Sequence, residues 1–185
     1  MSKRVCPWWL GYFLASPLRR LITDPHKLLS PYVHDSMTVL EPGPGMGFFT
    51  LELARLVGQE GRVIAPDVQE KMLTKLRQKA RKAGLLSRIE ARLVPSDTMQ
   101  LDDVAGQVGF TLAYAVVHEL PSAAKFFEEA GIASKKGAIL LLVEPSGHVN
   151  EQEFADELRL AGDAGFAIVE RPGISGTHAA VLRKQ

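Results

Sequence analysis

Three glycines at alternate positions, Gly43, Gly45 and Gly47, constrain the fold of this chain more than any other feature. They directly follow an apolar segment at residues 38–41 and directly precede a segment of helical period at residues 48–57. A chain that passes from a strand into a helix at such a point must turn sharply, and glycine allows both the turn and the close approach of a ligand to the backbone. The segment therefore predicts a strand, a tight loop suited to a ligand, and a helix in succession.

The same alternation of short apolar runs and segments of helical period continues beyond the glycine loop. Further strands are predicted at residues 62–65, 89–94, 109–117, 138–143, 167–170 and 179–182, and helices at 25–29, 69–83, 122–133 and 151–161. Strands that alternate with helices are typical of α/β proteins with a mainly parallel sheet. The last two strands flank a turn-rich segment at residues 172–176, which predicts an antiparallel hairpin at the end of the sheet.

Length and composition favour one globular domain over residues 1–185. Of the 185 residues, 46% are hydrophobic, which is enough to bury a core without metals or disulfides. The formal net charge is +1, from 22 basic and 21 acidic residues, so the overall charge gives no reason to expect a nucleic acid as partner. No later stretch approaches the length of about 20 apolar residues that spans a bilayer, and no membrane span is expected.

The start of the chain has one feature of a signal peptide. Lys3 and Arg4 precede an apolar run at residues 5–15, but the run contains a proline, a glycine and two tryptophans, and no cleavage site follows it. The single Cys6 cannot form an intramolecular disulfide, which fits a reducing compartment. A cytoplasmic location is therefore expected, and one thiol is too few to predict a metal site.

Which ligand the glycine loop binds depends on the residues around it. A phosphate-binding P-loop needs a lysine and a hydroxyl residue after its last glycine, whereas Phe48 and Phe49 follow Gly47. A dinucleotide-binding loop needs glycine or alanine at the position of Phe48, and the carboxylate of Glu41 would repel a pyrophosphate. The P-loop is therefore excluded and a dinucleotide is disfavoured, while a tight turn without any ligand stays open.

S-adenosylmethionine reverses the electrostatic argument, because it carries a sulfonium and an ammonium group and no phosphate. The carboxylate of Glu41 would then favour binding. Residues 39–47, Val-Leu-Glu-Pro-Gly-Pro-Gly-Met-Gly, resemble the first motif of class I S-adenosylmethionine-dependent methyltransferases, in which an acidic residue is followed by alternate glycines. The resemblance extends over about residues 32–184, and it implies that S-adenosylmethionine is the cofactor.

The resemblance also implies the fold. It predicts a doubly wound, Rossmann-like α/β sheet of seven strands in the order 3-2-1-4-5-7-6, with strand 7 antiparallel, within residues 32–185. Residues 1–31 lie outside this core and would form an N-terminal helical lid. Residues 7–14 of that segment hold both tryptophans of the protein. Because large aromatic side chains suit a core as well as a ligand pocket, core packing is the alternative to a lid.

Two aspartates follow the second and third predicted strands, at the edge where open α/β sheets bind ligands. Asp67 can accept hydrogen bonds from both hydroxyls of a ribose, or it can cap the helix that follows. In the methyltransferases that the chain resembles, an aspartate at the place of Asp97 binds the adenine amino group; taken alone, Asp97 would be an ordinary turn residue. The resemblance also assigns the next residues, Val68 and Thr98, to the cofactor site.

A catalytic base is needed only when the acceptor must lose a proton, because the sulfonium is already a good leaving group. His118, at the end of the predicted fourth strand, is the candidate base, and Glu119 would either orient it or cap the next helix. A lone histidine is more often a surface or capping residue. His148, after the fifth strand, is a weaker candidate for the same pocket.

These observations predict an S-adenosylmethionine-dependent methyltransferase that acts on a small, partly apolar acceptor. No appended recognition domain is evident, which favours a small molecule over a folded macromolecule. Two alternatives stay open: a nicotinamide-dependent oxidoreductase, and a protein that binds S-adenosylmethionine without transferring its methyl group. Nothing in the sequence specifies an oligomeric state.

Overall fold

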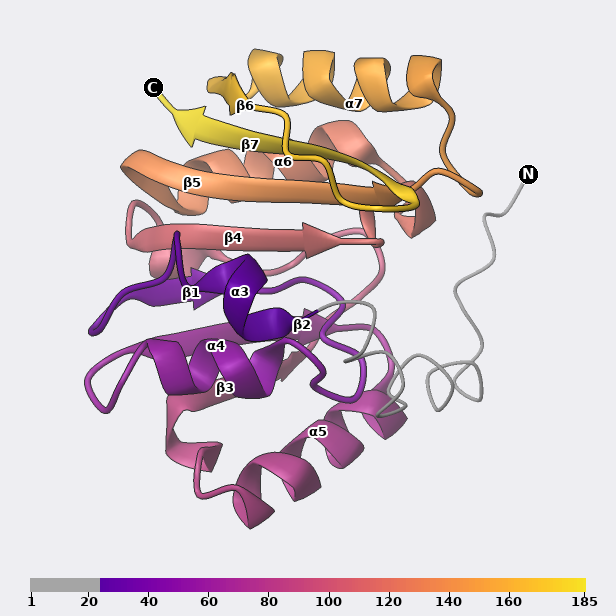
Figure 1. Cartoon of the computed structure of the whole chain (residues 1–185). Helices are drawn as coiled ribbons and strands as arrows, with labels where there is room; N and C mark the ends of the chain where they lie inside the picture. Colours follow the sequence, from indigo (N-terminus) through magenta and orange to yellow (C-terminus); the bar gives the residue numbers. More distant parts are fainter. Residues whose placement is uncertain (1–23) are drawn as a thin grey trace. The chain divides into compact units, whose positions relative to one another are not determined.

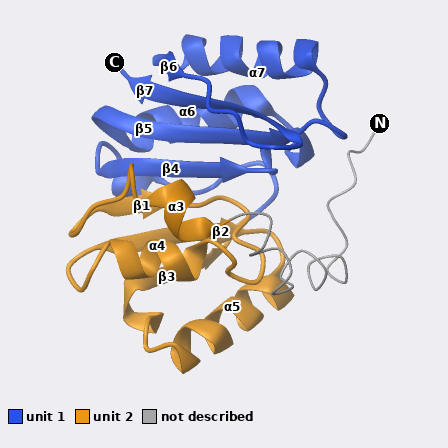
Figure 2. Ribbon diagram, in the orientation of Figure 1, with its two compact units in different colours: residues 1–5, 95–185 blue, residues 6–94 orange. Residues whose placement is uncertain are grey.

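The computed structural model describes residues 24–185, and the predictions for Cys6 and the aromatic residues 7–14 lie outside the described residues. Within the described range, seven strands have the hydrogen-bonded order β3-β2-β1-β4-β5-β7-β6. The fold class that the family resemblance implied is therefore confirmed. The described chain divides into two compact units: residues 24–94, drawn in orange in Figure 2 and called the first unit below, and residues 95–185, drawn in blue and called the second unit. The single domain expected from the length of the chain stays a prediction.

Three parallel strands form the sheet of the first unit (Figure 1). Its elements in chain order are α3 (Pro25–Leu29), β1 (Thr38–Leu40), α4 (Thr50–Leu56), β2 (Arg62–Asp67), α5 (Glu70–Lys82), the 3-10 turn η1 (Leu86–Arg88) and β3 (Ile89–Leu93). Strand β2 pairs in parallel with both β1 and β3, while α4 packs against β2 and α5 packs against β2 and β3. Each connection between parallel strands therefore contains a helix, as βαβ units require.

The short helix α3 begins as its sequence predicts. Asp24 is the N-cap residue, and its side chain accepts hydrogen bonds from the N–H groups of His26 and Lys27 at 3.0 and 3.3 Å. Pro25 occupies the first helical position. Proline has no N–H to leave unsatisfied there, so cap and proline together define the start of the helix.

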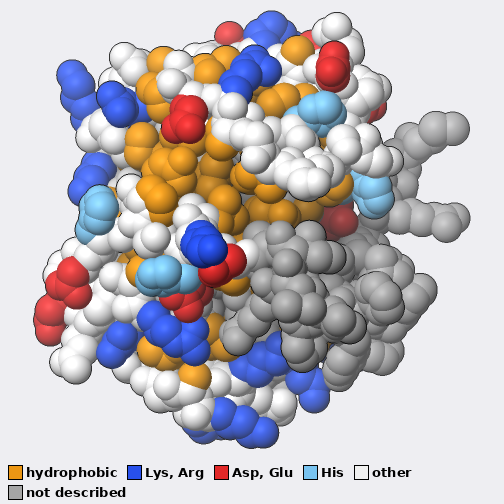
Figure 3. Space-filling view, in the orientation of Figure 1, with side chains coloured by type: hydrophobic (Ala, Val, Ile, Leu, Met, Phe, Trp, Pro, Cys, Tyr) orange, Lys and Arg blue, Asp and Glu red, His pale blue; other side chains and the backbone are white. Residues whose placement is uncertain are grey.

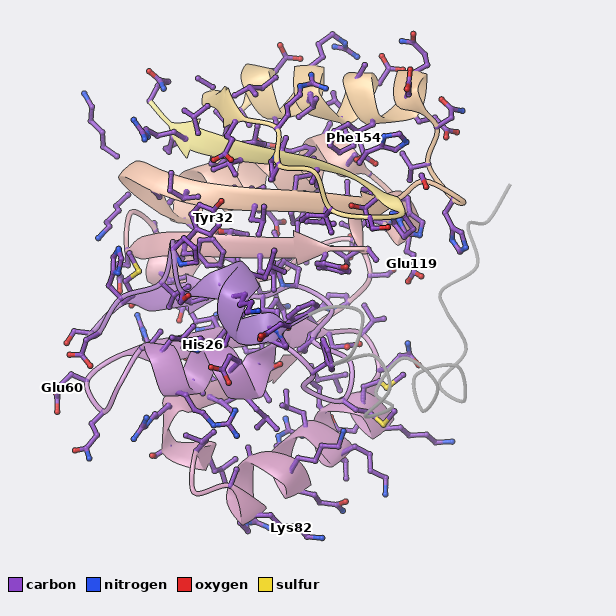
Figure 4. The ribbon with its side chains drawn as sticks, viewed as in Figure 1. His26, Tyr32, Glu60, Lys82, Glu119 and Phe154 are labelled. Carbon is purple, nitrogen blue, oxygen red and sulfur yellow. The ribbon has the colours of Figure 1, made fainter. Side chains whose placement is uncertain are left out.

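Helix α5 is amphipathic, as its spacing predicts. Its buried face consists of Met72, Leu73, Leu76 and Ala80. Lysine and arginine side chains gather around this helix at the bottom of Figure 3, and Lys82 points away from the unit in Figure 4. Gly84 follows the last turn with a φ of +69°, a left-handed conformation that commonly ends a helix.

Four strands form the sheet of the second unit. Its elements in chain order are η2 (Asp102–Val104), β4 (Val108–Tyr114), η3 (Val117–Glu119), α6 (Ala123–Ala133), β5 (Ser134–Pro145), α7 (Glu151–Asp163), β6 (Phe166–Glu170) and β7 (Thr177–Lys184). Strands β4 and β5 are parallel, whereas β7 runs antiparallel to both β5 and β6. The antiparallel hairpin predicted around residues 172–176 and the direction of strand 7 are thus confirmed.

Side-chain caps define the starts of both helices in this unit. The hydroxyl of Ser122 accepts a hydrogen bond from the N–H of Lys125 at 3.2 Å, and Asn150 and Glu153 form a capping box at the start of α7. The inner face of α6 contributes Phe127, which is completely buried. Among the helices of residues 24–185, none has the length and apolar content needed to cross a lipid bilayer.

Two strands differ most from their predicted limits. Strand β4 ends at Tyr114 rather than at residue 117, because Ala115 adopts a left-handed φ of +55° and a 3-10 turn follows. Strand β5 begins at Ser134 rather than at residue 138. The hydroxyl of Ser134 donates to the carbonyl of Ala130 at 2.7 Å where α6 ends, and its backbone pairs with Val108 of β4.

Candidate functional site

The loop after β1 reaches α4 through the three glycines. Gly43, Gly45 and Gly47 have φ values of +63°, +53° and +84°, which residues with side chains rarely adopt. The N–H of Gly43 donates to the carbonyl of Pro66 in β2 at 2.9 Å. The sharp turn predicted from the alternate glycines is therefore present, and it is tied to the neighbouring strand.

Gly45 and Gly47 have different surroundings. A Cβ atom at Gly47 would lie 2.6 Å from Cδ1 of Leu76, a buried residue of α5, so glycine here allows the loop and the helix to pack closely. A Cβ atom at Gly45 would meet no atom of the described residues within 4 Å. Open space beside a left-handed glycine is where a ligand can approach the backbone.

Asp67, at the end of β2, connects the glycine loop to the start of α5. Its side chain is buried; Oδ1 accepts a hydrogen bond from the N–H of Gln69 at 2.8 Å, and Oδ2 accepts one from the N–H of Gly45 at 3.3 Å. The N-cap residue of α5 is Gln69 rather than Asp67, so the capping alternative does not describe this aspartate. Each oxygen of a carboxylate can accept more than one hydrogen bond, as binding of both ribose hydroxyls would require.

Glu41 places a buried carboxylate at the start of this loop. Its side chain is 4% exposed, and its Oε2 has no hydrogen-bond partner among residues 24–185. Burial, with a contribution from the negative charge of Asp67, raises the pKa of Glu41 to about 8, although the Thr50 hydroxyl partly opposes the shift. A cationic group placed against Glu41 would satisfy this oxygen and favour the ionised form, whereas a phosphate would do neither.

The third predicted carboxylate belongs to the second unit. Asp97 is exposed in a turn that follows β3, and the hydroxyl of Thr98 accepts a hydrogen bond from the N–H of Gln100 at 3.1 Å. In the first unit, the side chain of Val68 is 38% exposed directly after Asp67. The structure thus brings the glycine loop, Glu41 and Asp67 together within one unit. The parts of the predicted adenine site lie on separate units.

His118 lies in the 3-10 turn η3 rather than at the end of β4, and this position gives it a specific partner. The ring Nδ1 of His118 is hydrogen-bonded to Oε2 of Glu144, a completely buried residue near the end of β5. Oε1 of Glu144 accepts a hydrogen bond from the N–H of Val117 at 2.8 Å. The hydrogen bond from Glu144 raises the pKa of His118; burial lowers it, and the charges of Glu119 and Glu157 raise it further.

Glu144 was not predicted as a site residue, although the sequence contained a signal for it. It directly follows the apolar core of a strand, as Glu41 follows β1. Glu144 is hydrogen-bonded to the ring of His118 and Ser122 caps α6, while the charge of Glu119 raises the pKa of His118. Figure 4 shows Glu119 beyond the carboxyl end of β4.

His148, the weaker candidate, does lie beside His118. The two rings have centroids 5.4 Å apart and meet edge to face, at an interplanar angle of 84°. Within residues 24–185, no group of three or more His, Cys, Asp or Glu side chains is arranged to hold a metal ion. The second unit therefore offers a histidine held by a buried carboxylate, with a second histidine next to it.

Comparisons with solved structures agree with this geometry. A SAM-dependent methyltransferase from Aquifex aeolicus has a TM-score of 0.84 and 26% sequence identity, and the similarity covers 97% of this chain and 98% of that one. The geranyl diphosphate C-methyltransferase from Streptomyces coelicolor A3(2), solved with Mg²⁺, geranyl diphosphate and S-adenosyl-L-homocysteine, has a TM-score of 0.72 at 13% identity. That similarity covers 91% of this chain and 78% of the Streptomyces chain, and it shows a shared fold.

Sequence comparisons identify the family. A curated relative, the ubiquinone/menaquinone biosynthesis C-methyltransferase UbiE of Escherichia coli O1:K1 / APEC, is 38% identical over 58 residues, which is 31% of this chain and 23% of that enzyme. The chain therefore matches less than a quarter of the length of this relative. The methyltransferase domain family, in contrast, matches residues 33–170. The chain belongs to this family, the S-adenosylmethionine-dependent methyltransferases that its glycine loop resembles.

Proposed function

We propose that this protein transfers a methyl group from S-adenosylmethionine to a small, partly apolar acceptor. The observation that carries the proposal is the buried carboxylate of Glu41, whose Oε2 has no partner among residues 24–185 and which lies close enough to Asp67 for the two charges to interact. Two neighbouring carboxylates favour a cationic ligand and oppose a pyrophosphate. This argues for the methyltransferase cofactor and against a nicotinamide dinucleotide.

Each predicted cofactor residue then has a role. Glu41 would bind the ammonium group of the cofactor, the backbone of Gly43, Gly45 and Gly47 would line its methionine portion, and Asp67 would accept the ribose hydroxyls. The exposed side chain of Val68 would contact the adenine ring. Asp97 would accept a hydrogen bond from the adenine amino group, and the N–H of Thr98 would face the ring. Bound S-adenosylmethionine supplies an electrophilic methyl group on a good leaving group, so the protein has mainly to align the acceptor and exclude water.

His118 is our candidate for the catalytic base. It follows β4 at the carboxyl edge of the second unit's sheet, where open α/β folds bind their ligands. The bond between Nδ1 and Glu144 leaves Nε2 as the ring atom that can take a proton. The acceptor is proposed to be small and partly apolar, since the UbiE relative is an enzyme of ubiquinone and menaquinone biosynthesis.

Isothermal titration and thermal unfolding with S-adenosylmethionine or NAD test the cofactor assignment. We expect S-adenosylmethionine, but not NAD, to bind and to raise the unfolding temperature, because a ligand of the native state stabilises it. Asp67→Ala should weaken that binding. The control is Asp102→Ala, which changes an exposed aspartate of η2 outside the proposed site. Stabilisation by NAD with no heat of binding for S-adenosylmethionine would overturn the assignment.

A further inference from the structure

We propose that Glu144 is a positioning residue that holds His118 ready to remove the proton of a neutral hydroxyl group on the methyl acceptor. The proposal rests on the proposed function and deepens it in two ways. It adds a residue that the sequence did not single out, and it names the chemical class of the acceptor atom, a weakly acidic oxygen such as that of a phenol or an enol.

The hydrogen bond to Glu144 fixes the tautomer of His118. A carboxylate can only accept a hydrogen bond, so the ring nitrogen bonded to Glu144, Nδ1, must carry its hydrogen. In the neutral ring the other nitrogen, Nε2, then has the lone pair. His118 is therefore fixed as the tautomer in which Nε2 accepts a proton, which is the form that a general base requires.

Glu144 is itself held in one position by burial and hydrogen bonding. Its side chain is completely buried, and the N–H of Val117 holds its Oε1 at 2.8 Å. Its backbone pairs with His178 of β7, and the preceding Val143 pairs with Tyr114 of β4. From β5, the carboxylate therefore makes two hydrogen bonds to the turn η3 that follows the neighbouring strand β4, one to the N–H of Val117 and one to the ring of His118. A base held in this way loses little freedom when it takes up a proton.

The electrostatic environment of His118 is negative. The groups that act on its ring are Glu144 from β5, Glu119 from η3 and Glu157 from α7, and the His148 ring meets it edge to face. Three carboxylates stabilise an imidazolium once it has formed, and they oppose the approach of an anion. A carboxylate or phosphate acceptor would be repelled here, whereas a neutral hydroxyl can approach and then lose its proton.

The chemical step balances with these groups and the cofactor alone. The hydroxyl proton of the acceptor moves to Nε2 of His118, and an electron pair of the acceptor oxygen forms the bond to the methyl carbon. The electrons of the broken carbon–sulfur bond stay on sulfur, so the products are a methyl ether and S-adenosylhomocysteine. His118 then returns the proton to solvent, and no oxidant or reductant takes part.

Nuclear magnetic resonance of protein labelled with ¹⁵N in its histidines tests the positioning role without any acceptor. We expect neutral His118 to carry its hydrogen on Nδ1 and to titrate above its ordinary value. Glu144→Gln should lower the pKa of His118, because a charged, hydrogen-bonded partner is removed. The control Glu119→Gln removes a nearby charge but leaves the hydrogen-bonded partner, and it should lower the pKa less.

The ¹⁵N spectrum of the wild-type protein reports the tautomer of His118 even if the Glu144→Gln protein does not fold. Hydrogen on Nε2 of neutral His118 in the wild-type protein would overturn the proposal, as would an unchanged pKa in a folded Glu144→Gln protein. Calorimetry on the same sample measures the binding of S-adenosylhomocysteine, and it distinguishes a failure of the proposed function from a failure of the role proposed for Glu144. Failure to bind it counts against the proposed function, while binding together with the wrong tautomer counts against this proposal alone.

A spectroscopic probe tests the acceptor class. With S-adenosylhomocysteine bound, 4-nitrophenol at about pH 6 should bind and show the absorbance of its ionised form, because the imidazolium of His118 stabilises the phenolate beside it. His118→Asn should abolish that absorbance, and benzoate should bind more weakly than 4-nitrophenol. The acceptor class would be wrong if millimolar 4-nitrophenol did not bind, if it bound without ionising, or if benzoate bound better.

Discussion

Replacing Glu41 by glutamine should stabilise the unliganded protein at high pH and weaken its affinity for S-adenosylmethionine. Burial, together with the charge of Asp67, raises the pKa of Glu41 from its ordinary value of 4.5 to about 8. One pKa unit corresponds to about 1.4 kcal/mol, so a fully ionised Glu41 costs the folded protein about 5 kcal/mol relative to the unfolded chain. Glutamine has the same shape and carries no such cost.

The sign of the pH dependence follows from the direction of the shift. Because the pKa of Glu41 is raised in the folded state, its contribution to stability is complete below pH 4.5 and is lost as the pH rises to about 8. Between about pH 6 and about pH 9 the wild-type protein should lose about 3 kcal/mol from this group. The Glu41→Gln protein loses none of it, so the gap between the two free energies of unfolding widens by that amount.

Urea unfolding at both pH values, followed by circular dichroism, measures this gap. Other titrating groups change equally in the two proteins and cancel in the difference. Glu60→Gln is the matched control, because Glu60 is exposed in a loop (Figure 4) and should give the same difference at both pH values. A gap between wild type and Glu41→Gln that stays constant from about pH 6 to about pH 9 would refute the reasoning.

The pH dependence of S-adenosylmethionine binding gives a second measure of the ionisation of Glu41. An ammonium group against Glu41 favours its ionised form, so binding of S-adenosylmethionine below about pH 8 must expel a proton from this carboxyl. The affinity should therefore rise with pH, by up to about tenfold per pH unit below that point. Calorimetry at about pH 6.5 in two buffers of different ionisation enthalpy should detect the released proton for wild type and not for Glu41→Gln.

Three further substitutions follow from the same structure. Gly45→Ala should weaken the binding of S-adenosylmethionine, measured by calorimetry. Its control is Gly84→Ala, because Gly84 has a similar left-handed φ and equally open surroundings among the described residues; each substitution should cost about 1–2 kcal/mol of stability, but Gly84→Ala should leave binding intact. Equal affinity of the two variants would contradict this prediction. Phe127→Ala should lower the free energy of unfolding by about 3–5 kcal/mol in urea, since Phe127 is completely buried, and a loss below about 1 kcal/mol would contradict the packing. Ser122→Ala removes the cap of α6 and should cost about 1 kcal/mol in the same assay; no loss would contradict the capping role.

The elements of the fold could be predicted because each has a local cause in the sequence. Asp24 and Pro25 define the start of α3, and the helical spacing of Met72 and Leu76 identifies the buried face of α5. The strand order needed more than local pattern, since apolar runs do not say which strands pair. It came from the family resemblance, and the hydrogen-bonded order of the strands confirms it.

The limits of β4 and the partner of His118 could not be predicted for a related reason. The apolar residues through Val117 suggest that the strand continues, but the N–H of Val117 bonds to Glu144, which is distant in the sequence and lies on the neighbouring strand. This long-range bond accompanies a turn in which Ala115 has a left-handed φ. Nearest neighbours in the sequence pointed to Glu119 instead, because sequence proximity takes no account of the register between parallel strands.

Glu41 and Glu144 show how the two units use a buried carboxylate for opposite purposes. Both lie at the ends of apolar strands and both are buried, yet their hydrogen bonds differ. Each oxygen of Glu144 has a partner in its own unit, the N–H of Val117 or the ring of His118, so this carboxylate fixes the position of another side chain. Oε2 of Glu41 has no hydrogen-bond partner among residues 24–185. A buried polar atom without a partner lowers the stability of the folded protein until a ligand supplies the hydrogen bond. We therefore propose that Glu41 binds the cationic group of the cofactor and that Glu144 positions the residue that takes the proton.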